Sequence, residues 1–187
     1  MANPPSASSV ELNTTLHRIA LVGNPNTGKT SLFNALTGLN QRIGNYPGVT
    51  VEKKAGYFQA GQERVEIIDL PGTYSMAARS LDEAIVSNVL LRPADPSEAI
   101  ELIVAIVDAS NLTRNLYLLS QLLEMGLPVV LVLNMIDLAS IKGYTIYAEK
   151  LSDRLGIPVV PICANKRKGI EDVVTTIVEQ LHARVYP

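Results

Sequence analysis

The segment at residues 23–30 has the residue types and spacing of a phosphate-binding loop. Its sequence GNPNTGKT fits the pattern G-x-x-x-x-G-K-[ST] without a mismatch, between an apolar run and a predicted helix. Gly23 and Gly28 would let backbone N–H groups point inward at a polyphosphate, at the positive end of the helix dipole. Lys29 would neutralise the outer phosphates, and the hydroxyl of Thr30 would bind a magnesium ion that bridges them. The candidate nucleotide-binding residues of this segment are Gly23, Asn24, Pro25, Asn26, Thr27, Gly28, Lys29, Thr30 and Ser31.

A second candidate phosphate contact is the sequence DLPG at residues 69–72. Asp69 follows a predicted strand, and its carboxylate is a candidate ligand of the same magnesium ion. Gly72 would direct its backbone N–H toward a terminal phosphate. The pattern D-x-x-G is weak by itself, so its weight comes from the phosphate-binding loop upstream.

The base of the nucleotide is predicted from Asn134 and Asp137, which follow another apolar strand as N-x-x-D. The Asp137 carboxylate can accept two hydrogen bonds, and guanine presents a ring N–H beside an exocyclic amine, whereas adenine lacks this pair of donors. Asn134 would connect its loop to the phosphate-binding loop, and a backbone N–H of residues 163–165 would meet the guanine carbonyl. N-x-x-D alone fits an ordinary turn at a strand end, but the two motifs together favour a guanine nucleotide. The candidate base-contacting residues are Asn134, Met135, Asp137, Cys163, Ala164 and Asn165.

These motifs need a scaffold that brings the ends of several strands together. The apolar runs predict an α/β fold with a six-stranded, mostly parallel sheet, helices on both faces, and one antiparallel strand supplied by a hairpin. Residues 40–48 are polar and glycine-rich, which predicts a mobile loop. The predicted strands cover residues 19–22, 51–58, 64–70, 102–107, 129–133 and 159–162. The last helix is predicted to face the core with Ile170, Val173, Val174, Ile177 and Leu181.

Composition limits the number of domains and the classes of partner. With 187 residues, 47% of them hydrophobic, the chain suits one domain, which we place at residues 16–187 after a disordered leader at residues 1–15. The formal charge of -2 gives no reason to expect a nucleic-acid partner. A single cysteine fits a reducing cytoplasm. No apolar run reaches the ~20 residues of a membrane helix, which predicts that this chain alone is soluble.

Together with Thr50, the motifs above resemble the five guanine-nucleotide motifs of small GTPase domains, in order. The stretches GNYPGVTVEKK at residues 44–54, DLPGTYS at residues 69–75 and DASNLTRNLYL at residues 108–118 are similar to the cytosolic G domain of the ferrous-iron transport protein B (FeoB) family. The resemblance covers about residues 18–181. It implies the P-loop GTPase fold and a GTP-binding, GTP-hydrolysing switch domain of a ferrous-iron uptake transporter.

The resemblance also implies cofactors, partners and a location. GTP or GDP, Mg²⁺ and K⁺ are the expected cofactors. In the family, a helical domain and a membrane-spanning iron-transport domain follow the G domain, and neither is present in this chain. The expected location is the cytoplasmic face of the bacterial inner membrane, and a homo-oligomer is compatible with the resemblance.

By resemblance, the loop that Thr50 closes is a switch. Gly48, Val49 and Thr50 would contact the nucleotide, and the Thr50 hydroxyl would be a second magnesium ligand. Thr73 stands where many GTPases have the glutamine that orients the attacking water. Asn26 would bind potassium in place of an arginine, because a neutral amide oxygen suits a monovalent cation. The candidate catalytic residues are Asn26, Lys29, Thr50, Gly72 and Thr73.

Three other functions stay open on the sequence. A soluble potassium-activated GTPase of ribosome assembly or tRNA modification would use the same motifs, although the one basic cluster, residues 166–168, is explained by a solvated loop. A non-enzymatic guanine-nucleotide switch would bind without turnover, and a P-loop ATPase or kinase is disfavoured by Asp137. The sequence indicates no set of iron ligands, because His17 and His182 lie far apart and Cys163 belongs to the base loop.

Overall fold

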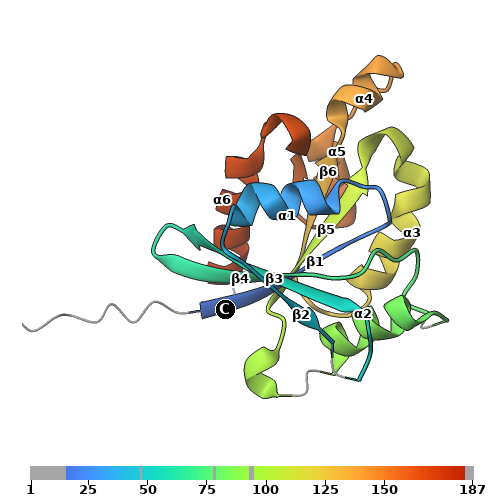
Figure 1. The fold of residues 1–187 in the computed structure, drawn as a ribbon. Coiled ribbons are helices and arrows are strands. Elements are labelled where there is room, and N and C mark those ends of the chain that lie inside the picture. The colour runs from blue at the N-terminus through green and yellow to red at the C-terminus, as the bar shows by residue number, and fades with distance from the viewer. Residues whose placement is uncertain (1–15, 47, 78, 93–94, 184–187) are drawn as a thin grey trace, which may run out of the picture.

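The computed structural model describes residues 16–46, 48–77, 79–92 and 95–183, which form a seven-stranded sheet with helices on both faces (Figure 1). The leader predicted at residues 1–15 lies outside the described residues. The strands are β1 (Leu16–Gly23), β2 (Gln41–Asn45), β3 (Glu52–Ala60), β4 (Glu63–Asp69), β5 (Leu102–Asp108), β6 (Val129–Asn134) and β7 (Val159–Pro161). The α-helices are α1 (Lys29–Thr37), α2 (Leu81–Leu91), α3 (Leu112–Leu123), α4 (Ile136–Ile141), α5 (Ala148–Leu155) and α6 (Ile170–His182). Short 3-10 helices are η1 (Pro96–Glu98), η2 (Ala109–Asn111) and η3 (Ala164–Lys166).

The strand order β2-β3-β4-β1-β5-β6-β7 confirms the predicted α/β class. β3 is antiparallel to both of its neighbours, as the predicted hairpin requires, and the remaining neighbouring pairs are parallel. Parallel neighbours end at the same edge of a sheet. The register accordingly places Gly23 at the end of β1 beside Ile106, and Asp108 at the end of β5 beside Asn134. This edge carries the predicted motifs.

The sheet has one strand more than the six predicted from the sequence. β2 lies inside the segment predicted as a mobile loop, and it pairs with β3 at the edge of the sheet. All of its residues are exposed, so it has no alternation of buried and exposed side chains. Its order comes from pairing with the backbone of a neighbouring strand, and a local hydrophobic pattern does not report that contact.

Two hydrophobic layers enclose the sheet (Figure 1). In β5, Leu102 and Ile106 pack with α1 and α6, whereas Ile103 and Val107 pack with α2 and α3. Burial of each such aliphatic side chain contributes roughly 1.5–3 kcal/mol. The predicted stripe of the last helix is buried at Ile170, Val173, Ile177 and Leu181. The central strands are therefore fixed from both faces, and the loops at their ends start from rigid positions.

Candidate functional site

The phosphate-binding loop joins the end of β1 to the start of α1. Gly23 has no room for a side chain, because a Cβ there would lie 2.5 Å from the carbonyl oxygen of Ile106. Gly28 has a φ of +86°, and a Cβ there would overlap the side-chain amide of Asn134. α1 begins at Lys29, so its first-turn N–H groups, which lack intrahelical partners, adjoin the loop. A loop of this kind at a helix N-terminus is suited to bind an anion.

A cavity of about 320 Å³ opens at this loop. Its lining residues are Asn24, Pro25, Asn26, Gly28, Lys29, Thr30, Ser31 and Gly72. The cavity therefore unites the segment at residues 23–30 with Gly72 of the D-x-x-G sequence. Lys29 Nζ lies 2.5 Å from Asp69 Oδ1, and both side chains are largely buried. This ion pair brings the candidate phosphate-binding cation and a candidate magnesium ligand to the same place.

Asn134 connects the base loop to the phosphate-binding loop, as the sequence predicts. Its Nδ2 donates to the carbonyl oxygen of Thr27 at 2.9 Å, and its Oδ1 accepts a hydrogen bond from the N–H of Ala164 at 3.0 Å. The side chain is buried, so both hydrogen bonds are shielded from water. One amide thus fixes the relative positions of three predicted segments: the phosphate-binding loop, the N-x-x-D loop and the loop after β7.

Asp137 lies at the rim of the site with a cationic partner. Lys166 Nζ lies 2.8 Å from Asp137 Oδ2, and 31% of the Asp137 side chain is exposed. The hydrogen bond from Lys166, followed by one with the Cys163 thiol, lowers the pKa of Asp137 to about 2. Burial raises the pKa of that thiol. Asp137 is therefore ionised near neutral pH, as an acceptor of two guanine N–H groups must be.

Sequence analysis missed the role of Lys166, because it assigned the basic cluster to a solvated loop. The ammonium of Lys166 is exposed, but it is held by the carboxylate that the same analysis proposed as the base reader. The only signal in the sequence is that Lys166 directly follows the base-loop residues 163–165.

Backbone conformation marks two of the predicted site residues. Among the described residues, non-glycine positions with positive φ are Asn26 (65°), Met135 (62°) and Arg167 (53°). This conformation costs roughly 1–2 kcal/mol for a residue with a Cβ, so surrounding contacts must hold it. Asn26 lines the cavity at the phosphate-binding loop, and Met135 lies directly before α4. Asparagine adopts this conformation more readily than most residues, whereas at Met135 the surrounding structure must hold it.

Thr73 has both of its donors engaged within the protein. Its N–H donates to the carbonyl oxygen of Gly23 at 3.2 Å, and its hydroxyl donates to the carbonyl oxygen of Ser75 at 2.8 Å. The residue is buried, with 2% of its surface exposed. Thr73 could therefore orient water only as a hydrogen-bond acceptor while these two hydrogen bonds are kept.

The switch residues 48–50 lie apart from the phosphate-binding cavity in this structure. Val49 lines a separate cleft of about 330 Å³, which it shares with Tyr46 and with Ile85 of α2. Thr50 is not among the described residues that line the cavity at the phosphate-binding loop. A contact between Thr50 and a magnesium ion in that cavity requires the segment to move.

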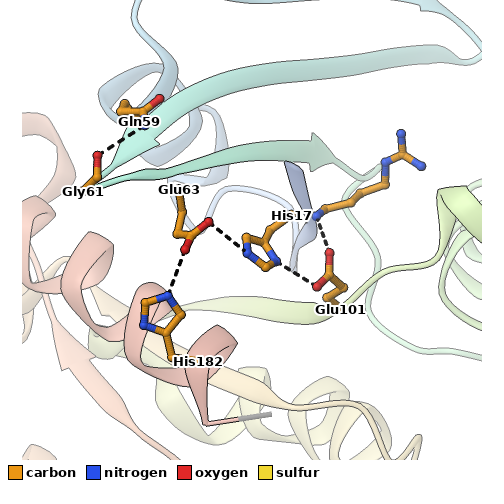
Figure 2. A network of polar contacts seen from close by, with 7 residues as sticks. His17, Gln59, Gly61, Glu63, Glu101 and His182 are labelled. Carbon is orange, nitrogen blue, oxygen red and sulfur yellow. Dashed lines mark hydrogen bonds and ion pairs between the residues drawn. The ribbon is translucent and has the colours of Figure 1, made fainter. Parts of the chain in front are cut away.

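A second polar cluster lies at the opposite ends of the parallel strands, where β1 and β4 begin (Figure 2). His17 Nδ1 lies 2.9 Å from Glu101 Oε2, and His17 Nε2 lies 3.3 Å from Glu63 Oε2. His182 Nε2, at the end of α6, lies 3.1 Å from Glu63 Oε1. The two histidines that the sequence separates therefore share one carboxylate. Their contacts, led by the hydrogen bond with His182, lower the pKa of Glu63.

Comparisons with known proteins agree with the motifs. Residues 17–177 match the family model for ferrous iron transport protein B. The chain is 49% identical over 157 residues to the Fe(2+) transporter FeoB of Escherichia coli (strain K12), and the match covers 82% of this chain and 20% of that protein.

Two solved structures are similar in fold and in sequence. The cytosolic domain of L. pneumophila FeoB matches with a TM-score of 0.82 and 48% identity, covering 87% of this chain and 63% of that chain. The cytosolic domain of the T. maritima FeoB iron transporter in GDP form II matches with a TM-score of 0.84 and 42% identity, covering 89% of this chain and 64% of that chain.

The matched region is a small part of the curated relatives. This chain spans about a fifth of the length of the E. coli transporter. Within the four described stretches of the chain, every helix is too short or too polar to cross a membrane.

Proposed function

The chain belongs to the ferrous iron transport protein B family, and on this premise we propose that it is the GTP-binding and GTP-hydrolysing domain of a ferrous-iron uptake transporter. The observation that carries the proposal is the buried amide of Asn134, which joins the phosphate-binding loop to the loop of Asp137. A polyphosphate site and a carboxylate suited to guanine are thereby held as one unit. The GDP form of the T. maritima relative supports the same class of ligand.

The phosphates and their magnesium ion are assigned to the cavity at the phosphate-binding loop. Thr30 lines that cavity, and Asp69 is linked to it through Lys29, so oxygen ligands suited to a hard cation are close by. Bound magnesium would neutralise the negative charge of the outer phosphates. Thr50 would complete the protein ligands after its segment moves, and the N–H of Gly72 would sense the terminal phosphate.

Potassium is assigned to Asn26, with a role in hydrolysis. Asn26 lines the cavity in a left-handed conformation, and no arginine is among the described residues that line it. Its neutral amide oxygen suits a monovalent cation, which would stabilise charge as the terminal phosphoryl group departs. Lys29, Gly72 and Thr73 would act beside it.

Family membership favours iron transport over a soluble GTPase of ribosome assembly or tRNA modification. The proposed partners are a helical domain and a membrane-spanning iron-transport domain of the full-length protein, at the cytoplasmic face of the bacterial inner membrane. A homo-oligomer is a further proposed assembly. The net charge of -2 gives no support to a nucleic-acid partner.

Displacement of a fluorescent GDP analogue tests the proposed ligand. We expect unlabelled GTP and GDP to displace it with magnesium present, and ATP to fail at concentrations at least a hundredfold higher. Equal displacement by ATP would show that Asp137 does not select the base, and the proposal of a guanine site would then be wrong.

The potassium proposal is tested by hydrolysis rates in potassium and sodium chloride at equal ionic strength. We expect a faster rate in potassium, and we expect the substitution Asn26→Ala to remove the difference. Asn88→Ala on α2, outside the phosphate-binding cavity, is the matched control and should keep it. Identical rates of the unmodified protein in the two salts would exclude Asn26 as a potassium ligand.

A further inference from the structure

A small polar pocket of about 140 Å³ lies between the phosphate-binding loop and the start of α3. Asn24 and Asn26 line it from the loop, and Asn115 and Arg114 line it from α3. Asn24 and Asn26 also line the nucleotide cavity, so the two cavities lie on either side of the same loop. Whatever fills this pocket therefore supports the loop that is proposed to bind phosphates.

Two buried amides in this pocket lack hydrogen-bond partners among the described residues. Only 3% of Asn24 is exposed, and neither its Oδ1 nor its Nδ2 has a partner. Asn115 is equally buried; its Nδ2 donates to the carbonyl oxygen of Asn111 at 2.8 Å, but its Oδ1 has no partner. A buried polar atom without a partner is strongly unfavourable, so each of these three atoms requires a polar partner.

The two charged residues around the pocket each have a contact within the protein. Asp108 Oδ1 accepts a hydrogen bond from the N–H of Ser110 at 2.8 Å. The Arg114 guanidinium stacks over the ring of Tyr74, 4.7 Å from its centroid. The pocket-lining atoms that are buried without a partner belong to neutral amides, which suit water as a partner. The volume agrees, because a water molecule occupies roughly 30 Å³ in the liquid and needs two to four polar partners.

We propose that Asn115 is a positioning residue for the phosphate-binding loop, and that it acts on Asn24 through water bound in this pocket. The Asn24 carbonyl oxygen accepts a hydrogen bond from the Thr27 hydroxyl at 2.9 Å, and the Thr27 carbonyl accepts one from Asn134. The loop is thus held by Asn134 on one side and by the bridge to α3 on the other. Loss of the bridge leaves the loop in place but less fixed, which weakens its hold on the phosphate next to the terminal one.

The test uses the ratio of the dissociation constants for GMP and GDP, because GDP offers the loop a second phosphate that GMP lacks. The inference rests on the proposed guanine site, so the unmodified protein is measured first. If it does not prefer GDP over ADP, the proposed function itself is wrong. Asn24→Ala, Asn115→Ala and the double variant are then compared, with Ser120→Ala on the exposed face of α3 as the matched control.

We expect each single substitution to lower the GDP preference about tenfold, and the double variant to lower it about tenfold as well, because both break one bridge. Asn115→Ser keeps a hydroxyl that can bind the same water, so it should retain most of the preference. Ser120→Ala should leave the ratio unchanged. A merely structural role would change the melting temperature without changing the ratio.

Two results would overturn the inference. One is an unchanged ratio in both alanine variants that bind guanine nucleotide. The other is a loss of about a hundredfold in the double variant, which would mean that the two residues act independently. If Asn115→Ala fails to fold, Asn24→Ala decides the matter, and an unchanged GDP preference in that variant overturns the inference.

Discussion

Asp137 already carries a partner, Lys166, before any base arrives. An incoming guanine must share or displace that ammonium, so the lysine competes with the ligand. The competition is small, because an exposed ion pair contributes little in water. Sequence analysis could predict Asp137 from the N-x-x-D spacing, but not its pairing with Lys166, since the pair depends on how two loops from different strands meet.

The first prediction concerns the base reader. Asp137→Asn replaces one acceptor oxygen by a donor, which opposes the exocyclic amine of guanine and suits the carbonyl of xanthine. We expect the preference for GTP over XTP to fall by about ten- to hundredfold, as for an unpaired buried group. Competition binding with both nucleotides measures it. If the variant keeps the unmodified preference, another group reads the base.

The second prediction concerns the competing lysine. Lys166→Ala frees the carboxylate, so we expect GDP to bind about two- to fivefold more tightly, which is the range for an exposed ion pair. Lys168→Ala removes the same charge from a nearby exposed position. It should change the affinity for GDP less than about twofold. Weaker GDP binding by Lys166→Ala alone would mean that the lysine contacts the nucleotide instead of competing with it.

Among the elements, those with local signals were predicted and those set by distant contacts were not. The strands predicted at residues 51–58 and 64–70 form the antiparallel pair β3 and β4. The stripe of α6 is likewise buried as predicted. β2 was missed because its side chains are all exposed, and the cluster of His17, Glu63 and His182 was missed because its members are brought together only by the sheet and α6.

That cluster gives a prediction about the attachment of α6. The pKa of Glu63 is lowered in the folded protein, so its stabilising effect is present above its ordinary pKa of 4.5 and is lost as the pH falls through the folded value. Glu63→Gln should therefore lower the melting temperature by about 1–3 °C at pH 5.5, and the difference should be smaller at pH 3.5 because protonation removes the charge of Glu63.

The control for Glu63 is Glu98→Gln, which removes an exposed carboxylate of η1. It should change the melting temperature little at either pH. A difference between Glu63→Gln and the unmodified protein that persists undiminished at low pH would show that the carboxylate charge is not what matters.

In the whole molecule, the sheet separates two polar regions at opposite strand ends, the nucleotide site and the histidine cluster. The sheet edge that gathers the motifs was predictable, because parallel strands end together and each motif follows an apolar run. The position of the switch was not, because Val49 lines a cleft with α2 in this structure, whereas the sequence shows only that residues 48–50 belong to a loop. Their contact with nucleotide therefore requires a rearrangement.

Limited proteolysis can test whether the switch segment rearranges. With a GTP analogue, the tethers through Thr50 and Gly72 should hold the segment at residues 40–51, and subtilisin should cut it several-fold more slowly than with GDP. Equal cutting of the segment in both states would contradict a switch of this kind.

The central claim is that this chain hydrolyses GTP, and single-turnover hydrolysis with protein in excess over radiolabelled nucleotide tests it most directly. With magnesium and potassium present, we expect GTP to be converted to GDP and phosphate, ATP to remain intact over the same time, and chelation of magnesium to stop the reaction. GTP that stays bound but uncleaved would identify a non-enzymatic switch, and cleavage of ATP at the same rate would remove guanine recognition from the account.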